Sequence, residues 1–189
     1  MNLSEKKPAL LLIDVQKGFE EENYWGGNRN NKEAEVICGK VLQRWRQLQW
    51  PIFHVRHSSS NPKSKLHKDH PGFAFHEAVL PQENEPIITK DVNSAFIGTD
   101  LKERLDQQNI TALIIVGLIT NHCVSTTTRM AGNFGYDTYV LSDATATFDR
   151  KGPDGKTYSA DIIHWTTLAN LNEEFATVLN HKELLTWVR

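Results

Sequence analysis

The stretch Ala112-Leu-Ile-Ile-Val-Gly-Leu-Ile-Thr-Asn-His-Cys123 decides the fold of this chain. Its first half, Ala112 to Val116, is an uninterrupted apolar run, which is typical of a strand buried on both faces of a parallel sheet. The run ends at Gly117, and a helical pattern covers Cys123 to Phe134, just before Gly135. The stretch therefore predicts a buried strand, a tight turn and a helix, with a thiol at the turn.

Similar runs recur along the chain and alternate with helical patterns. The predicted strands are Ala9–Ile13, Pro51–Val55, Pro86–Thr89, Ala112–Val116, Thr138–Leu141 and Phe175–Leu179. Between them, an apolar stripe from Val36 to Leu48, a capped segment from Thr99 and a run from Ala160 to Asn170 predict helices. This order predicts an α/β fold in three layers, with helices on both faces of a six-stranded, mainly parallel, doubly wound sheet.

Composition limits the classes of function. The 189 residues, 39% of them hydrophobic and 23% charged, predict one domain covering residues 1–189. A net charge of -2, with scattered Lys and Arg, argues against a nucleic-acid partner. The apolar run near the N-terminus is too short for a signal peptide or a membrane span, so we expect a cytoplasmic protein with no membrane partner. We therefore expect Cys38 and Cys123 to be free thiols.

Three chemically active side chains follow predicted strands. Asp14 ends the first strand, Lys90 ends the one near Pro86, and Cys123 follows the Ala112–Val116 strand. Taken singly, each has a structural interpretation: an aspartate that caps a turn, a solvated lysine, a small buried cysteine. Because ligands bind at the carboxyl ends of parallel strands, their coincidence at one edge favours a shared site.

The chemistry of nucleophilic hydrolysis uses this set. A helix N-terminus and a nearby ammonium would stabilise the Cys123 thiolate. Asp14 could take the thiol proton and return it to a departing amine. Backbone amides of Ile119 and Cys123 are the candidate donors of an oxyanion hole.

Four ordered motifs resemble the isochorismatase-like cysteine hydrolases over nearly the whole chain. They are Leu-Leu-Ile-Asp-Val-Gln-Lys-Gly-Phe19, Thr-Lys-Asp-Val-Asn-Ser-Ala-Phe96, Gly-Leu-Ile-Thr-Asn-His-Cys-Val-Ser-Thr-Thr126 and Ser-Asp-Ala-Thr-Ala-Thr147. The resemblance implies that Asp14, Lys90 and Cys123 form a catalytic triad. It also implies a six-stranded Rossmann-like sheet, a cis peptide before the cysteine at Leu118-Ile119, and a homodimer or homotetramer.

The family divides by chemistry. Isochorismatases cleave a vinyl ether without a cysteine nucleophile, so Cys123 favours the amide-cleaving branch. Nicotinamidases in that branch hold a metal through an Asp-x-His pair and another histidine, whereas this chain has His54-Val-Arg-His57, then His67 and His70, with no aspartate in place. His54 and His57 would face opposite sides of a strand, and surface histidines are the commoner explanation. We expect no metal and no cofactor.

Specificity is assigned to loops, chiefly the irregular stretch His57–Phe75. The candidate substrate-binding residues are Gln16, Phe19, Phe73 and Asn121. Phe19 matches an aromatic that often packs on substrate in relatives, and Asn121, where many relatives have Asp, is expected to cap the helix. Phe75, Phe96 and Phe148 could add apolar surface but fit core packing equally well. The tryptophans at 45, 50, 165 and 187 are expected in the core, and Cys38 is interpreted as structural.

The sequence thus predicts a hydrolase that cleaves a C–N bond of a small amide or ureido compound through a thioester at Cys123. Two alternatives remain: vinyl ether hydrolysis with Asp14 alone, and a non-catalytic binding protein on the same fold. The substrate itself is not predicted.

Overall fold

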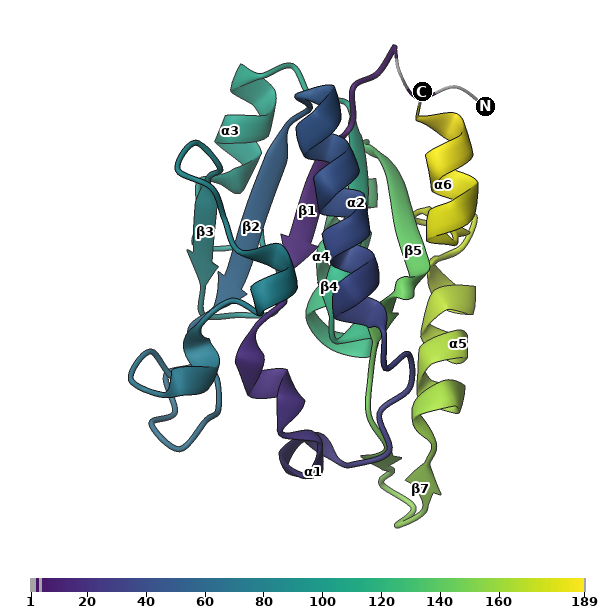
Figure 1. Ribbon diagram of the computed structural model, residues 1–189. Coiled ribbons are helices and arrows are strands. Elements are labelled where there is room, and N and C mark those ends of the chain that lie inside the picture. The colour runs from purple at the N-terminus through teal and green to yellow at the C-terminus, as the bar shows by residue number, and fades with distance from the viewer. Residues whose placement is uncertain (1–2, 4, 189) are drawn as a thin grey trace.

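A six-stranded sheet forms the centre of the molecule in the computed structural model, which describes residue 3 and residues 5–188 (Figure 1). The strands are β1 (Ala9–Ile13), β2 (Ile52–His57), β3 (Ile87–Lys90), β4 (Ala112–Leu118), β5 (Asp137–Ala146) and β8 (Thr177–Leu179). Their order in the sheet is β3-β2-β1-β4-β5-β8, and all five neighbouring pairs are parallel. The predicted doubly wound sheet is confirmed.

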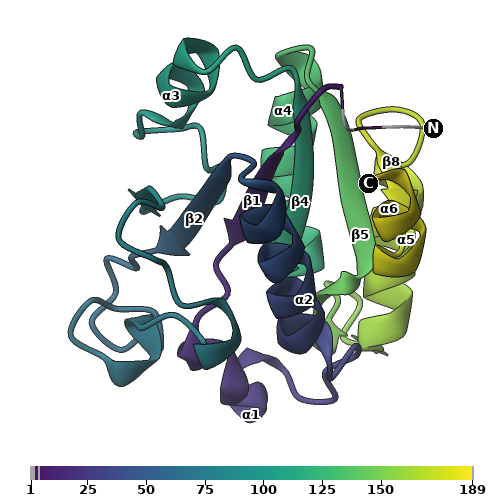
Figure 2. The same ribbon diagram turned by 45° about the horizontal axis from the view of Figure 1, so that its top comes forward.

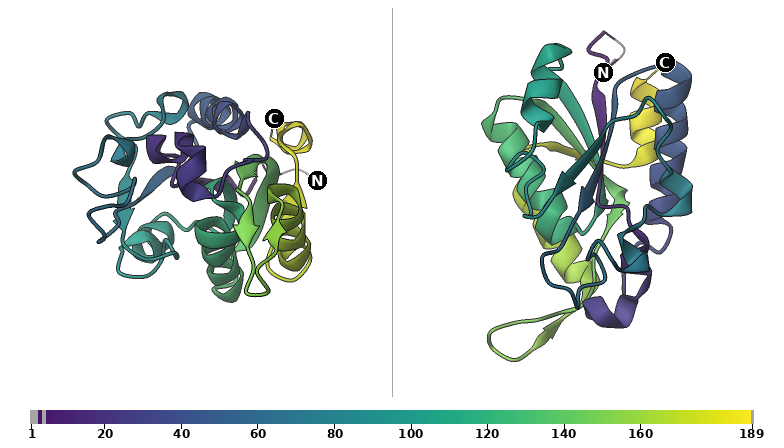
Figure 3. Two further views of the ribbon diagram at one scale, coloured as in Figure 1. Left: turned by 90° about the horizontal axis from the view of Figure 1, so that it is seen from below. Right: turned by 90° about the vertical axis from the view of Figure 1, so that its left-hand side faces the viewer.

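Helices cover both faces of this sheet, as Figure 3 shows when the sheet is seen along its edge. One face carries α2 (Ala34–Leu48) and α6 (His181–Trp187). The other face carries α3 (Leu101–Gln107), α4 (Ser125–Asn133) and α5 (Ala160–Leu171). Figure 2 shows α2 lying in front of β1 and β4, the two central strands.

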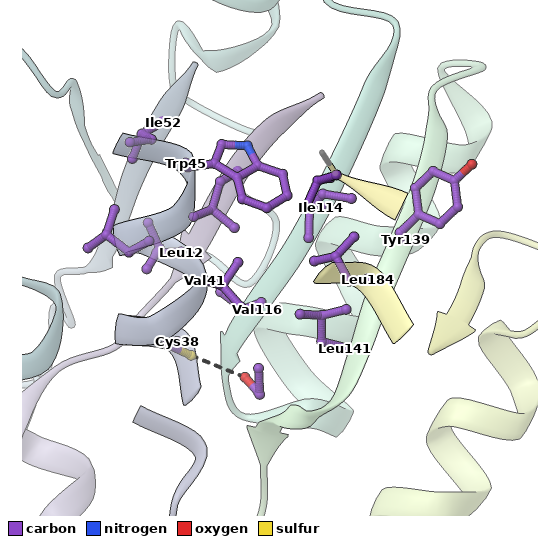
Figure 4. Packing of buried hydrophobic residues seen from close by; sticks show 14 of the residues in the cluster. Leu12, Cys38, Val41, Trp45, Ile52, Ile114, Val116, Tyr139, Leu141 and Leu184 are labelled. Atoms are coloured by element: carbon purple, nitrogen blue, oxygen red, sulfur yellow. Dashed lines mark hydrogen bonds between the residues drawn. The ribbon is translucent and has the colours of Figure 1, made fainter. Parts of the chain in front are cut away.

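Each face has its own apolar core. Between the sheet and α2, the core includes Trp45, Val41 and Leu12, each at most 1% exposed (Figure 4). Cys38 lies in the same cluster, and its Sγ donates to the Ala144 carbonyl at 3.3 Å. Burial raises the pKa of this thiol. Cys38 is therefore a structural residue, as the sequence predicts.

The order in which strands are added to the sheet reverses between β1 and β4, which makes this the switch point of the sheet. The two strands approach closely at Gly117, whose φ is +122°. A Cβ atom at Gly117 would lie 1.9 Å from the Ile13 carbonyl oxygen, so only glycine fits. Ligands of doubly wound proteins bind in the crevice outside such a switch point.

The strand ends and some short elements differ from the sequence prediction. Strand β5 continues to Ala146, five residues beyond the predicted end at Leu141. The predicted surface loop of residues 149–158 contains a small antiparallel hairpin of β6 (Arg150–Lys151) and β7 (Thr157–Tyr158) that projects from the body (Figure 3). Helices α1 (Glu22–Trp25) and α6 were not predicted.

Trp165 corrects another expectation. It is 58% exposed on α5, so its assignment to the core is wrong, whereas Trp45 and Trp50 are buried and pack edge to face. Strongly apolar residues occur all round α5, so the sequence pattern does not indicate which side of this helix faces the sheet. Among the described helices, none is long and apolar enough to cross a membrane.

Candidate active site

Asp14 is the first residue after β1, where the chain leaves the sheet. Its backbone adopts a left-handed conformation with a φ of +51°, and its N–H donates to the Val55 carbonyl at 2.9 Å. The turn directs the side chain into the protein at the carboxyl edge of the sheet, where Asp14 is 0% exposed. A buried carboxylate requires a partner.

Lys90, the last residue of β3, supplies that partner. Its Nζ donates to Asp14 Oδ2 at 2.7 Å, and both side chains are fully buried. Burial acts to lower the pKa of Lys90, but the neighbouring Asp14 and Cys123 outweigh it and raise the pKa above its usual value. The pair is therefore a buried ammonium and carboxylate.

Cys123 lies next to this ion pair, in a turn of π-helix at Thr120–Val124 that leads into α4. Such wide turns are frequent at functional sites. The thiol is 9% exposed and its Sγ lies 3.8 Å from Asn93 Oδ1. The sequence predicts convergence of Asp14, Lys90 and Cys123, and the structure brings the three together.

The charge state of Cys123 differs from the expected one. Burial and the Asp14 carboxylate raise the pKa of the thiol, and the opposing effect of Lys90 is too small to reverse this. The expectation of a stabilised thiolate in the resting site is not met, because burial and Asp14 together outweigh the ammonium of Lys90. The Cys123 side chain is therefore a protonated thiol at neutral pH.

One oxygen of Asp14 is available to this thiol. Whereas Oδ2 is held by Lys90, Oδ1 is buried without a hydrogen-bond partner among the described residues. The Cys123 sulfur and a carboxylate oxygen of Asp14 lie within 4.8 Å of each other. The site can therefore move a proton from sulfur to oxygen.

A small pocket of about 200 Å³ has Cys123 in its lining. Its lining combines aromatic and polar side chains: Phe19, Trp25, His57, Ser59, Ser64, Leu66, Asn93, Ile119, His122 and Cys123. Phe19 is the one aromatic side chain predicted for substrate binding that the pocket contains. Trp25 packs on it with ring centroids 4.7 Å apart.

Trp25, His57 and Asn93 were missed by the sequence analysis as site residues. Trp25 belongs to a four-residue helix without a periodic pattern, so nothing in the sequence marks it. Asn93 belongs to a quoted motif, three residues after Lys90, and that spacing could have identified it. His57 ends β2 beside β3, a position that the strand-end rule could also have identified.

The other predicted substrate-binding residues lie outside this pocket lining. Gln16 is buried, and its side-chain amide bonds the backbone of His57 and Phe73. The Phe73 ring lies under the Arg56 guanidinium at 4.5 Å.

Asn121 does not cap the helix. Its side-chain oxygen instead accepts from the Thr147 hydroxyl at 2.5 Å, which connects the π-helical turn at Thr120–Val124 to the end of β5.

The histidines have separate surroundings. His54 is fully buried with Nε2 2.7 Å from Glu85, so its assignment to the surface is wrong. His57 lies on the opposite side of β2, as expected, but faces the site rather than solvent. His67 and His70 accept from loop backbone amides through Nδ1. These contacts do not gather the four rings into one ligand set, and the absence of a metal stays a prediction.

The expected cis peptide bond is found at Leu118-Ile119. It precedes the turn, and both Ile119 and Cys123 line the pocket. Amides at the beginning of a helix have no carbonyl one turn earlier to pair with, so they can bind a developing negative charge.

The fold and this cluster define a doubly wound α/β protein that carries the groups of a nucleophilic hydrolase. The isochorismatase domain model matches residues 8–183. The chain is 48% identical over 181 residues to the uncharacterised isochorismatase family protein YrdC of Bacillus subtilis (strain 168), with 96% of each chain covered. A crystal structure of an isochorismatase-family protein from Chromobacterium violaceum has a TM-score of 0.94 at 38% identity, covering 99% of this chain and 96% of the other. The chain belongs to the isochorismatase family of hydrolases.

More distant relatives have names that state a chemistry. Nicotinamidase 3 of Arabidopsis thaliana is 27% identical, covering 96% of this chain and 88% of its own. A streptothricin hydrolase of Streptomyces noursei is 29% identical over 75% of this chain and 50% of its own. A cysteine hydrolase from Pseudomonas syringae has a TM-score of 0.86 at 25% identity, covering 96% and 92%.

Proposed function

We propose that this protein is a cysteine-dependent amidohydrolase that cleaves a C–N bond of a small amide or ureido compound through a thioester at Cys123. The observation that carries the proposal is the thiol beside a buried ion pair, with one carboxylate oxygen of Asp14 unpartnered among the described residues. Relatives named nicotinamidase, streptothricin hydrolase and cysteine hydrolase support it.

The first half-reaction forms the thioester. Asp14 Oδ1 takes the thiol proton while Cys123 Sγ attacks the carbonyl carbon. The resulting oxyanion accepts hydrogen bonds from the backbone amides of Ile119 and Cys123. When the tetrahedral intermediate collapses, the C–N bond breaks and the proton on Asp14 passes to the departing nitrogen, so ammonia or an amine leaves neutral.

The second half-reaction releases the acid. Water attacks the thioester carbonyl and gives a proton to Asp14. The C–S bond then breaks, and the proton returns from Asp14 to the sulfur, which restores the resting thiol. Lys90 orients Asp14 through its hydrogen bond, and its positive charge stabilises the sulfur as the thiol proton leaves.

The pocket limits the substrate to a small molecule. A volume of about 200 Å³ accommodates a compound of small size, and the lining offers apolar surface from Phe19 and Trp25 together with polar groups of Ser59, Ser64 and Asn93. A panel of primary amides, carbamoyl compounds and lactams, assayed by ammonia or amine release, would identify the preferred class.

Replacement of Cys123 tests the nucleophile. Cys123→Ala should reduce turnover at least about a hundredfold, and mass spectrometry of the native protein with a slow substrate should show an acyl adduct on Cys123. Cys38→Ser is the matched control and should leave turnover unchanged, since Cys38 lies in the core. Full turnover by Cys123→Ser together with cleavage of a vinyl ether would contradict the thioester mechanism.

A further inference from the structure

His57 contacts the ion pair of the site from a third direction. It ends β2, pairs in register with Lys90 of β3, and places its ring Nδ1 3.2 Å from the Lys90 Nζ. The ring borders the pocket on one side. The chemistry proposed above does not use this ring.

The identity of its neighbour fixes the protonation of the ring. An ammonium donates hydrogen bonds and accepts none, so the Nδ1 that faces Lys90 must carry a lone pair. His57 is therefore neutral, with its proton on Nε2. A hydrogen bond with the backbone of Val92 is consistent with this tautomer.

The ammonium has three N–H groups, and the structure offers three acceptors. They are Asp14 Oδ2 at 2.7 Å, His57 Nδ1 at 3.2 Å and the sulfur of Cys123. Without the His57 acceptor, one N–H of a buried ammonium is left unpaired, and the lysine side chain loses the contact that orients it. The Lys90 ammonium is then no longer held in a single position.

The backbone of His57 is clamped as firmly as its ring. The His57 N–H donates to Gln16 Oε1 at 2.8 Å, and Gln16 Nε2 donates back to the His57 carbonyl at 3.1 Å. The same Gln16 amide also donates to the Phe73 carbonyl at 2.9 Å. Since Gln16 is 1% exposed, this clamp is shielded from water and links the turn after β1 to the end of β2.

We propose that His57, clamped by Gln16, is a positioning residue that holds the Lys90 ammonium against Asp14 and Cys123 by accepting its third N–H. The role rests on the proposed cysteine hydrolase function. It also gives the site an acid limit, because a protonated His57 cannot accept from Lys90 and would place a second cation beside it.

The groups around His57 have opposing effects on its charge. Lys90 of β3 disfavours a positive ring, whereas Asp14 after β1 and Asp91 after β3 favour it. Burial is the largest effect, and together with Lys90 it lowers the pKa of His57 below its usual value. The sulfur of Cys123 also lies near the ring and is not one of the groups that shift the pKa of His57. The acid limit should therefore lie below pH 6.5, the usual pKa of histidine.

The tautomer can be measured without substrate. In protein labelled with ¹⁵N-histidine, the ring nitrogens of His57 should show the neutral Nε2–H form at pH 7, assigned by loss of the signal in His57→Asn. An imidazolium or the Nδ1–H form at that pH would overturn the proposal. This result does not depend on whether the protein hydrolyses amides.

Acylation of Cys123 by p-nitrophenyl acetate, followed by p-nitrophenol release and mass spectrometry, tests the positioning role. His57→Leu, which removes the acceptor, should slow acylation by about 10 to 100-fold, as is typical for a residue that orients a catalytic group. His57→Asn keeps an acceptor near the Nδ1 position, so this variant should be acylated at most of the native rate. Because asparagine does not titrate, its acylation rate should no longer fall in acid. His67→Asn, a substitution of the same type away from Lys90, should behave as the native protein.

The outcomes separate the two proposals. If the native protein gives no adduct on Cys123, the hydrolase proposal fails, whatever the tautomer of His57. If the native protein is acylated and His57→Leu keeps both its rate and its pH profile, or if His57→Asn is as slow as His57→Leu, the positioning role is wrong. Should His57→Leu fail to fold, as judged by circular dichroism, the Asn variant and the tautomer decide the question.

Discussion

The thiol of Cys123 is buried beside a carboxylate, so it is protonated before substrate binds. This arrangement differs from sites in which a stable thiolate waits for the substrate. Here the proton leaves only as the C–S bond forms, with Asp14 as the acceptor in the proposed mechanism. A protonated thiol resists adventitious alkylation and oxidation.

Alkylation by iodoacetamide should therefore be slow at neutral pH. Because the pKa of Cys123 is raised, the thiolate fraction should still be increasing above pH 9, and the rate constant should rise about tenfold per pH unit there. The rate is measured by mass spectrometry of the Cys38→Ser variant, in which one cysteine remains. A plateau below pH 8 would show that the ammonium of Lys90 dominates after all.

At the level of elements, the close contact of β1 and β4 depends on a single glycine. Gly117→Ala would place a methyl group 1.9 Å from the Ile13 carbonyl oxygen in a backbone conformation that side chains rarely adopt. We expect the free energy of unfolding to fall by more than about 3 kcal/mol, measured by urea denaturation.

Gly135→Ala is the matched control for this substitution. Gly135 also has a positive φ, +85°, but no atom lies within 4 Å of its added Cβ. The free energy of unfolding of Gly135→Ala should fall by only about 1 kcal/mol, which is the cost of the strained backbone alone. Equal losses in the two variants would mean that crowding against β1 is not what makes Gly117 necessary.

The sequence predicts those parts of the molecule whose place in the fold follows from a local sequence pattern. Apolar runs identify all six strands of the main sheet, and the rule of strand ends locates Asp14, Lys90 and Cys123. Trp25 and the β6–β7 hairpin were not predicted because the elements that contain them are too short to show a periodic pattern. The role of Gln16 escapes prediction for another reason, since its partners lie 41 and 57 residues away.

Charge states depend on burial, which sequence pattern does not measure. Cys123 was expected to be a thiolate because of the helix N-terminus and the Lys90 ammonium, yet burial and the Asp14 carboxylate raise its pKa more than Lys90 lowers it. His54 illustrates the same point, because a polar residue on a predicted strand was assigned to the surface and is fully buried.

For the whole molecule, buried histidines should make stability fall in mild acid. Burial lowers the pKa of His54, His57, His122 and His164 below 6.5 in the folded state. The unfolded chain therefore binds more protons as the pH falls through 6.5, and each such histidine removes up to about 1.4 kcal/mol per pH unit.

Urea denaturation between pH 7 and pH 5 measures this loss. The His164→Gln variant, which has one buried histidine fewer, should show a shallower dependence on pH. Below this range Glu85 adds to the effect: hydrogen bonds from Arg46, Gln82 and His54 outweigh its burial and lower its pKa to about 2, so its contribution disappears as the pH falls from 4.5 toward 2. Stability that is constant from pH 7 to pH 5 would contradict the assignment.

Assembly into a homodimer or homotetramer stays a prediction. Light scattering coupled to size-exclusion chromatography measures the mass directly, and a mass of one chain of 21.5 kDa at micromolar concentration would show it to be wrong.

All residues that line the pocket lie between positions 19 and 123, although the sheet continues to β8. Asp14, Lys90 and Cys123 lie at or after the ends of three strands, whereas half of the pocket lining comes from two other segments of the chain, residues 19–25 and 59–66. The three chemically active residues and this half of the pocket lining thus come from different segments of the sequence. Replacing those two segments would change the shape of the pocket, while the sheet keeps Asp14, Lys90 and Cys123 in place.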